Sequence, residues 1–371
     1  MKLLFALPGF HKHDRGAEVA LLSVADELGR AGNAVTVVGA GEEQAGKNYA
    51  FRHAGAVPRE RFEWLPSLPV FRNETHWEDM FFATNMRRQI DLKTFDATVT
   101  CAFPFTHWAL RKHGPGGPKH FFVTQNGDWA AYSDKSEYSK FSCDGLVCTN
   151  PDYLERNADK WNCALIPNGA DLARFRPGPS ARAKFGLPED KKIVLMVSAF
   201  IETKRVADAV RAIAHTEDTF LVVAGDGPLR TDVEQLAASE LPGRFKRITL
   251  PASEMPQLYN SADVFLHLSL LESFGNVFVE AMACGLPIVA HDTDRLRWIV
   301  GDQEFLGDTE NQTELVALLG SALAAEKRSL NDNLERFSWP AIAQEYQAFF
   351  EATVNPSSAS TAKMAVSAVS S

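Results

Sequence analysis

Short apolar runs alternate with amphipathic segments along most of the chain. In the first half these runs predict strands at Lys2–Leu7, Ala34–Val38, Ala97–Cys101, His120–Thr124, Gly145–Cys148 and Ala164–Ile166. In the second half they predict strands at Ile193–Val197, Phe220–Ala224, Arg247–Leu250, Val264–Leu268 and Pro287–Ala290. Helix-period segments lie between them, among them Glu18–Gly29, Arg205–His215, Leu229–Leu241 and Asn276–Cys284. Alternating strands and helices are typical of βαβ units, so we expect two doubly wound, parallel-sheet α/β domains in series.

The expected domain boundary lies in Phe175–Glu189, where Pro, Gly and charged residues are concentrated between two predicted strands. We therefore expect an N-terminal domain over residues 1–175 and a C-terminal domain over residues 176–354. The carboxyl ends of both sheets should face a central cleft. The tail, residues 355–371, is small, polar and of low complexity, so we expect it to be disordered. The aromatic and Pro-rich stretch Glu60–Trp77 is predicted to be an insertion or lid in the first domain.

Charge and composition exclude several classes of partner. The net charge of −9 disfavours nucleic acid as a partner. No run of about 18 apolar residues occurs, so membrane contact is expected to be peripheral at most. The five cysteines include no CxxC pair, which indicates free thiols in the cytoplasm rather than a disulfide framework or zinc site. The segment His76–Phe95 mixes aromatic and basic residues, and either packs against the sheet or lies on a membrane surface.

The segment Ala262–Ala290 holds the strongest candidate chemistry. A predicted strand leads into a loop with Glu272 and Gly275, and then into a helix that contains Glu280. Gly275 allows close approach of a ligand to the backbone, and the free N–H groups at the helix start favour an anion such as a phosphate. Two carboxylates beside such a turn suit hydroxyl-rich groups, since they accept hydrogen bonds from a sugar and from a ribose.

Within this segment, ESFGNVFVEAMACGLPIVA carries two glutamates at E-x7-E spacing and resembles the donor-site signature of retaining glycosyltransferases of the GT-B fold, in particular family 4, the glycosyl transferases group 1. Further matches follow in the family's order: RGAE at residues 15–18, IPNGADLARF at 166–175, TKR at 203–205 and VVAGDGPLR at 222–230. The resemblance extends to about Phe350. It implies a GT-B fold with an N-terminal acceptor domain, a C-terminal donor domain and a last helix, Trp339–Ala352, that crosses back to the first domain.

The resemblance also implies roles for individual residues. Glu280 would hold the ribose hydroxyls of a nucleotide, and Lys204 would pair with its diphosphate. Glu272 would hold the donor sugar, together with the backbone of Phe274, Gly275, Asn276 and Val277. Gly16, in the loop after the first strand, would bring backbone N–H groups to the phosphates.

Two departures from the family's pattern affect the site. Ala199 stands where the family usually has an Arg before the Lys, so Arg15 or Arg205 is expected to supply that diphosphate contact. Asn126 replaces a His near the reacting carbon of the sugar, and an amide cannot act as a base. Asp128 and His107 are then the nearest titratable residues for proton handling, although His107 is more readily explained as a structural residue.

The sequence therefore predicts a cytoplasmic, retaining glycosyltransferase that transfers a sugar from a nucleotide-diphosphate donor to a glycan or lipid-linked acceptor, in the latter case at the inner face of the membrane. Asn126, Asp128, Lys204 and Glu272 are its candidate catalytic residues, and neither a cofactor nor a metal is expected. The alternatives are a nucleotide-sugar epimerase or a phosphorylase on the same fold, or a non-catalytic nucleotide-sugar-binding homologue. A dinucleotide-dependent oxidoreductase is disfavoured, because no G-x-G-x-x-G follows the first strand.

Overall fold

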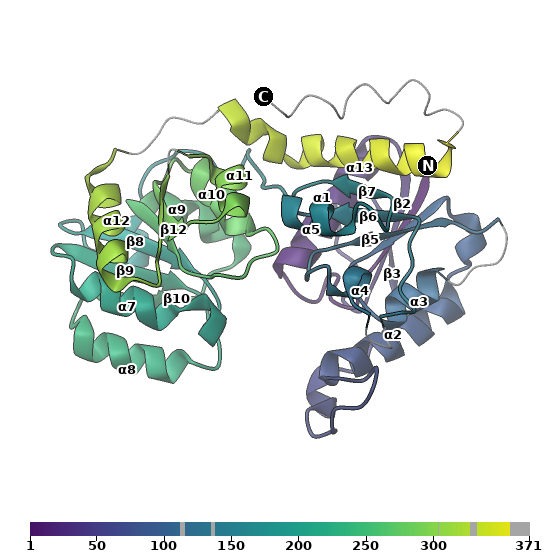
Figure 1. Cartoon of the computed structure of the whole chain (residues 1–371), viewed down its shortest axis with the longest axis horizontal. Helices are drawn as coiled ribbons and strands as arrows, with labels where there is room; N and C mark the ends of the chain where they lie inside the picture. Colours follow the sequence, from purple (N-terminus) through teal and green to yellow (C-terminus); the bar gives the residue numbers. More distant parts are fainter. Residues whose placement is uncertain (112–115, 135–137, 303, 327–331, 357–371) are drawn as a thin grey trace. The chain divides into compact units, whose positions relative to one another are not determined.

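The computed structural model describes residues 1–111, 116–134, 138–302, 304–326 and 332–356, which form two compact units (Figure 1). Met1–Asn168 and the chain from Trp339 onward make the first unit, and Gly169–Ser338 make the second. The division falls seven residues before the position 175/176 expected from the sequence. Ala170 and Phe175 belong to the second unit because both side chains are buried in its core. Nearly all of the tail predicted to be disordered, from residue 357 on, lies outside the described residues.

The first unit is built on a parallel sheet. Within the described residues its strands run in the order β3-β2-β1-β4-β5-β6-β7. They are β1 (Lys2–Ala6), β2 (Ala34–Gly39), β3 (Ala50–His53), β4 (Ala97–Thr100), β5 (Lys119–Val123), β6 (Gly145–Cys148) and β7 (Cys163–Leu165). The inner strands β1, β4, β5 and β6 are buried almost throughout, which is why each reads as a continuous apolar run.

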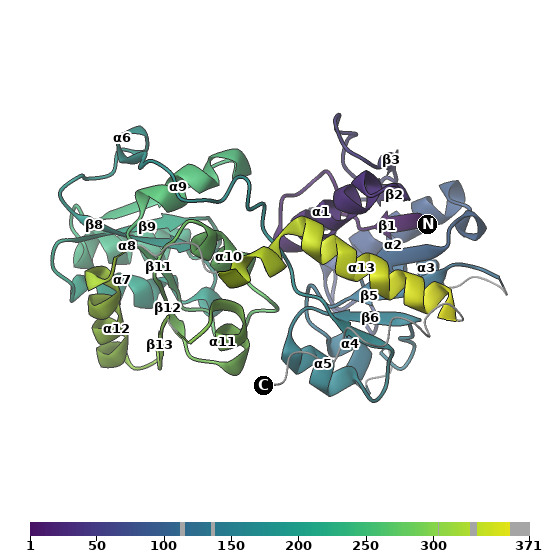
Figure 2. The same ribbon diagram turned by 90° about the horizontal axis from the view of Figure 1, so that it is seen from above.

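Helices cover both faces of this sheet. On one face α1 (Gly16–Arg30) and α13 (Trp339–Val354) pack side by side, and Figure 2 shows α13 lying along the sheet. Tyr346 and Phe350 of α13 are buried in the same core cluster as Phe5 of β1 and Phe121 of β5, so the last helix is an integral part of the first unit. The other helices of the unit are α2 (Glu74–Gln89), α3 (Phe105–Arg111), α4 (Trp129–Tyr132) and α5 (Pro151–Asn157), with 3-10 turns η1 (Arg59–Phe62) and η2 (Leu92–Thr94).

The second unit repeats the design with a separate parallel sheet. Its strands run in the order β10-β9-β8-β11-β12-β13 among the residues described. They are β8 (Lys192–Val197), β9 (Thr219–Ala224), β10 (Phe245–Ile248), β11 (Val264–His267), β12 (Ile288–His291) and β13 (Phe305–Gly307). Successive residues of β8 enter different core clusters, Ile193 and Leu195 on one face and Val194 and Met196 on the other, as strand geometry requires.

Each face of the second sheet has its own helices. The clusters of buried residues place α7 (Val206–Ala214), α8 (Arg230–Glu240) and α12 (Gln312–Ala324) on one face, and α9 (Met255–Ser261), α10 (Asn276–Ala283) and α11 (Asp294–Val300) on the other. The remaining elements are α6 (Arg182–Phe185), η3 (Glu202–Lys204), η4 (Ala252–Glu254) and η5 (Asp332–Phe337). Two doubly wound units in series confirm the α/β fold predicted from the hydrophobic pattern.

Both sheets contain a topological switch point. The chain leaves β1 toward β2 on one side and later returns to pair β4 on the other, and β8 lies in the same way between β9 and β11. In open α/β sheets, ligands bind outside the carboxyl ends of the strands at such a point. The loops after β1 and β4, and those after β8 and β11, are therefore the places to search for binding sites.

The segment proposed either to pack or to meet a membrane is largely the helix α2. Its side chains Phe82 and Met86 are fully buried in the first unit, and Trp77 stacks on Phe71 with ring centroids 4.0 Å apart. Phe81 stacks on Phe62, which belongs to the segment predicted as an insertion or lid. These contacts account for the aromatic residues of α2 by packing. Within the described residues, no helix has the length and apolar character needed to span a membrane.

Candidate functional site

Three side chains converge at the switch point of the second sheet. Lys204 ends η3 in the connection after β8, His267 is the last residue of β11, and Glu272 lies in the loop after β11. The carboxylate oxygen Oε1 of Glu272 accepts a hydrogen bond from Lys204 Nζ and lies 2.9 Å from His267 Nε2. The fold thus joins residues 68 positions apart in the sequence at the predicted donor site.

The Glu272 carboxylate is held in its charged form. Burial alone would raise its pKa, but the hydrogen bond and charge of His267 and the ammonium group of Lys204 lower the pKa from 4.5 to about 2. An ionised carboxylate accepts hydrogen bonds without donating any, so this group is suited to bind hydroxyl groups. The hydrogen bonds from Lys204 and His267 compensate the cost of burying the charge.

The loop that carries Glu272 is anchored at its backbone as well. Arg295, the second residue of α11, donates a hydrogen bond through its guanidinium to the carbonyl oxygen of Glu272. His267 is buried, and its second ring nitrogen, Nδ1, has no hydrogen-bond partner among the described residues. Nε2 is the ring nitrogen that faces the ionised carboxylate of Glu272. Nε2 therefore carries the hydrogen atom and donates the hydrogen bond.

The turn after Glu272 has the geometry expected from its glycine. Gly275 adopts φ 86° and caps α10, and a Cβ at this position would lie 2.7 Å from the ring of Phe278. Phe274 is buried, whereas Asn276 and Val277 are partly exposed at the start of the helix. Gly275 contributes no capping side chain, and the dipole at the start of α10 favours an anion such as a phosphate.

Glu280 lies one turn into α10, and a buried tyrosine holds its carboxylate in place. Its Oε2 accepts a hydrogen bond of 2.7 Å from the hydroxyl of Tyr259, a fully buried residue of α9. Burial raises the pKa of Glu280, while the Tyr259 hydrogen bond and the charge of Arg174 oppose that shift. With Oε2 occupied, Oε1 is the oxygen that remains to accept hydrogen bonds from a pair of ribose hydroxyls.

Arg205, considered from the sequence as a substitute for the missing diphosphate arginine, has other partners. Its backbone adopts φ 54° at the start of α7, and its guanidinium donates to the carbonyl of Leu268 and to both oxygens of Thr309. It also forms an ion pair of 2.8 Å with Asp208. Arg205 therefore ties the loops after β11 and β13 together, and Lys204 is the cation that reaches the Glu272 carboxylate.

The first unit has a pocket of its own at its switch point. A cavity of about 310 Å³ is lined by Leu7, Pro8 and Gly9 after β1, by Cys101, Ala102 and Phe103 after β4, and by Asn126 and Gly127 after β5. Asn126, the residue in place of the family's His, thus faces a cavity. Gly16 is the first residue of α1, and open space surrounds the position of a Cβ there.

The two titratable candidates of the first unit are both engaged within the protein. Asp128 is buried, forms a bidentate pair with Arg156 at 2.8 and 3.2 Å, and accepts a further hydrogen bond from Asn157. His107 is fully buried and lies 3.0 Å from His120, and burial keeps its pKa well below the ordinary value. Proton handling by Asp128 would require it to leave its ion pair.

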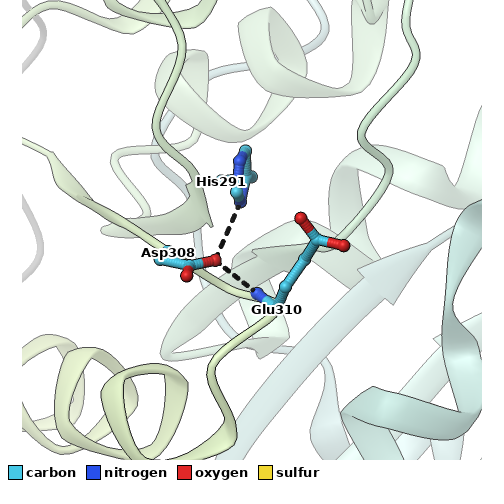
Figure 3. Close-up of side chains that lie close together, drawn as sticks. All are labelled: His291, Asp308 and Glu310. Carbon is cyan, nitrogen blue, oxygen red and sulfur yellow. Dashed lines mark hydrogen bonds and ion pairs between the residues drawn. The ribbon is translucent and has the colours of Figure 1, made fainter.

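One group of side chains has the composition of a cation site. His291 at the end of β12 and Asp308 and Glu310 after β13 bring ligand atoms within 4.8 Å of one another (Figure 3). The turn itself accounts for this proximity: His291 Nδ1 accepts the Thr309 N–H at 3.2 Å, and Asp308 Oδ1 accepts the Glu310 N–H at 2.9 Å. The Nδ1 lone pair of His291 is thus already used by the turn, and we assign the cluster no role.

Sequence reasoning missed His267, Arg295 and Tyr259 as partners of the two glutamates. A histidine inside the apolar strand VFLHL was an available signal, because an imidazole in a buried strand requires a partner. Arg295 and Tyr259 lie 23 and 21 positions from their partners on helices, and nothing in their local sequence marks them. Folding alone brings them to the site.

Comparisons with known proteins agree with this geometry. Residues 179–336 match the family described as Glycosyl transferases group 1. The lipopolysaccharide core biosynthesis glycosyltransferase LpsD of Rhizobium meliloti (strain 1021) is 29% identical over 223 residues, 59% of this chain and 62% of that protein. The chain spans about half the length of the curated relatives it matches. The predicted resemblance to group 1 glycosyltransferases is thereby confirmed, with the family's domain in the second unit.

Solved structures match the fold over nearly the whole chain. The sucrose-phosphate synthase of Thermosynechococcus elongatus superimposes with a TM-score of 0.77 and 22% identity, covering 95% of this chain and all of that one. HepE of Anabaena in complex with UDP and glucose gives a TM-score of 0.67 and 18% identity, covering 98% and 99% of the two chains. The two units thus have the fold of GT-B glycosyltransferases.

Proposed function

We propose that this chain, which carries a glycosyl transferases group 1 domain within a GT-B fold, is a retaining glycosyltransferase that uses a nucleotide-diphosphate sugar. The acceptor is a hydroxyl group of a glycan or of a lipid-linked sugar. The observation that carries the proposal is the convergence of Lys204, His267 and Glu272 at the switch point of the second sheet, in the loop that leads into α10.

In this proposal each part of the donor has a partner in the second unit. Glu280 binds the ribose through Oε1, since Tyr259 occupies Oε2. Glu272 binds hydroxyls of the sugar, together with backbone groups of Phe274–Val277. Lys204 has three N–H donors, so it can keep its bond to Glu272 and also contact the diphosphate. The HepE complex with UDP and glucose supports a nucleotide-sugar donor by analogy of fold.

The main requirement of the chemical step is to stabilise the charge on the leaving diphosphate. The bond between the anomeric carbon and the diphosphate oxygen breaks as the acceptor oxygen forms a new bond on the same face. Lys204 and the N–H groups that open α10 stabilise the charge that develops on the diphosphate. The departing phosphate oxygen then takes the acceptor's proton. Asn126 of the first unit binds a hydroxyl through its amide and cannot act as a base.

A nucleophilic role for Glu272 is disfavoured, because its ammonium and imidazole partners lower its pKa to about 2 and reduce its basicity. The proposal needs neither a metal nor a cofactor, since cationic side chains and backbone N–H groups serve the diphosphate. We place the reaction in the cytoplasm, at the inner face of the membrane where the acceptor is lipid-linked. The free thiols of Cys101 and Cys148, both buried, are consistent with a reducing compartment.

Proton NMR of the released sugar tests this proposal. The protein is incubated with UDP-, GDP- and ADP-hexoses with and without EDTA, and the anomer that appears first is recorded before mutarotation. The proposal expects transfer to water with the donor's anomeric configuration, unchanged by EDTA and abolished in Glu272→Ala. Release of the opposite anomer contradicts retention, return of an epimerised donor indicates an epimerase, and binding without turnover indicates a non-catalytic homologue.

A further inference from the structure

The turn after β5 presents Asn126 between two buried polar residues. Asn126 is exposed and lines the cavity of about 310 Å³ in the first unit. Gln125 before it is 9% exposed, and Asp128 after it is 3% exposed. The pair with Arg156 fixes Asp128 on the far side of the turn. The orientation of Asn126 therefore depends on what holds Gln125 on the near side.

The side-chain amides of Gln125 and Asn168 form a reciprocal pair. Gln125 Nε2 donates to Asn168 Oδ1 at 2.6 Å, and Asn168 Nδ2 donates back to Gln125 Oε1 at 2.8 Å. Two hydrogen bonds between planar groups fix their relative orientation as well as their distance. Both residues are buried, so breaking the pair would leave polar groups without solvent to replace it.

Asn168 gives this amide pair a fixed base. It follows Ile166 by two residues, and the Ile166 side chain is buried in the core of the first unit. The Ile166 N–H also donates to the carbonyl of Cys148, the last residue of β6, at 3.0 Å. The amide pair thus links the turn after β5 to a segment 43 positions further along the chain that is anchored in the core.

The backbone of the turn is tight enough to transmit a displacement of Gln125 to its neighbour. The carbonyl of Thr124 accepts the Gly127 N–H at 3.3 Å. Gly127 adopts φ 98°, and a Cβ there would lie 3.1 Å from Trp129 Cδ1. The indole Nε1 of Trp129 donates to the carbonyl of Asn126 at 3.3 Å. The turn has little room to adjust if the amide pair is lost.

We propose that Gln125 and Asn168 are positioning residues for Asn126, and that their amide pair sets the direction of the Asn126 side chain. The inference rests on the proposed function, in which Asn126 binds a hydroxyl group during sugar transfer. A contact that orients the reacting groups stabilises the transition state more than it stabilises the bound donor. Loss of the pair is therefore expected to lower kcat while KM for the donor changes little.

Steady-state kinetics of the full chain test this inference, with UDP-, GDP- and ADP-hexoses as donors and water as the acceptor. Gln125→Ala and Asn168→Ala each remove the amide pair and should lower kcat about tenfold. The double variant Gln125→Asn/Asn168→Gln exchanges the two amides, keeps their combined length and should recover part of the loss. The control is Gln347→Ala, which removes the 3.1 Å amide contact to Asn33 elsewhere in the first unit and should keep the wild-type kcat.

The indole N–H of Trp129 gives a second readout, which is independent of turnover because this group donates to the Asn126 carbonyl. Its signal in the proton–nitrogen NMR spectrum, assigned with Trp129→Phe, should shift in both alanine variants and return toward wild type in the exchanged variant. Thermal unfolding establishes that each variant is folded.

Three results overturn the inference: wild-type kcat in either folded alanine variant, a change in KM alone, or an indole signal that the alanine substitutions leave in place. If the wild type turns over none of the three donors while the indole signal depends on the amide pair, the proposed transferase function fails and the positioning of Asn126 stands.

Discussion

His267 Nε2 lies 2.9 Å from Glu272 Oε1, and this pair connects the end of a buried strand to the loop of the proposed donor site. Of the groups that lower the pKa of Glu272, the His267 imidazole has the largest effect, through both its hydrogen bond and its charge. His267 is therefore a positioning residue for Glu272. Replacement by Leu should lower donor affinity at least about tenfold, since it leaves the Glu272 carboxylate buried with one donor fewer.

The conservative change His267→Gln separates positioning from packing. Its amide can donate to Glu272, so it should recover part of the donor affinity, whereas Leu fills the space without a donor. Isothermal titration calorimetry with the nucleoside diphosphate and with the intact nucleotide sugar measures the donor affinity of both variants. Equal losses for the Gln and Leu variants would show that the imidazole acts only by filling space.

The lowered pKa of Glu272 predicts a specific acid sensitivity. A carboxyl group whose folded-state pKa lies below its unfolded value contributes stability above the unfolded pKa, and loses it as the pH falls toward the folded one. Between pH 5 and pH 2, Glu272 should therefore contribute about 3 kcal/mol of the loss in unfolding free energy, taking the shift from 4.5 to about 2.

Urea unfolding as a function of pH checks this contribution. The Glu272→Gln variant should be less stable than wild type at pH 7 and should lose less stability over the same acid range. Glu310→Gln, an exposed acidic residue of the same unit, is the control and should follow the wild-type pH dependence. Parallel pH curves for wild type and Glu272→Gln would contradict the assigned pKa.

Replacement of Gly275 or Gly320 by alanine is expected to change the stability of the protein in opposite directions. Gly275→Ala places a Cβ 2.7 Å from the Phe278 ring at φ 86°, and should destabilise the protein by about 1–3 kcal/mol. Gly320 lies inside α12 with open space around a Cβ, so Gly320→Ala should stabilise by about 0.5–1 kcal/mol. Thermal unfolding measures both, and stabilisation by Gly275→Ala would contradict the geometry of the α10 turn.

Asp128→Asn distinguishes a structural role from proton handling. The change weakens the pair with Arg156 and should lower unfolding stability by about 1–3 kcal/mol, the cost of leaving a buried group poorly paired. Nucleotide binding by the second unit should remain. A variant with wild-type stability and no transfer activity would instead assign Asp128 to catalysis.

The sequence predicts the inner strands well because burial on both faces leaves an uninterrupted apolar run. It misses β3 and β13 for different physical reasons. In β3 only Phe51 is buried, so the edge strand carries no apolar pattern, and β13 has only three residues. The boundaries of α2 are also shifted from the expected His76–Phe95, because Asn73 caps the helix with its side chain and the helix ends at Gln89.

In the candidate site, too, some residues can be identified from the local sequence and others cannot. Glu272, Gly275 and Glu280 lie within nine residues, so one local motif identifies them together. The interactions that set their charge and orientation come from Lys204, Tyr259, His267 and Arg295, which reach the site only through the order of the strands and the packing of helices.

The measurement that tests the central claim most directly is a thermal-shift titration with UDP, GDP, ADP, TDP, CDP and NAD on wild type and on Glu280→Ala. A ligand at 100 times its Kd stabilises by about 2.7 kcal/mol, which moves the unfolding midpoint by several degrees. The account predicts that a nucleoside diphosphate shifts the wild type, and that the shift is lost in Glu280→Ala. A shift by NAD alone, or equal nucleoside diphosphate shifts in both proteins, would contradict the assignment of the donor site.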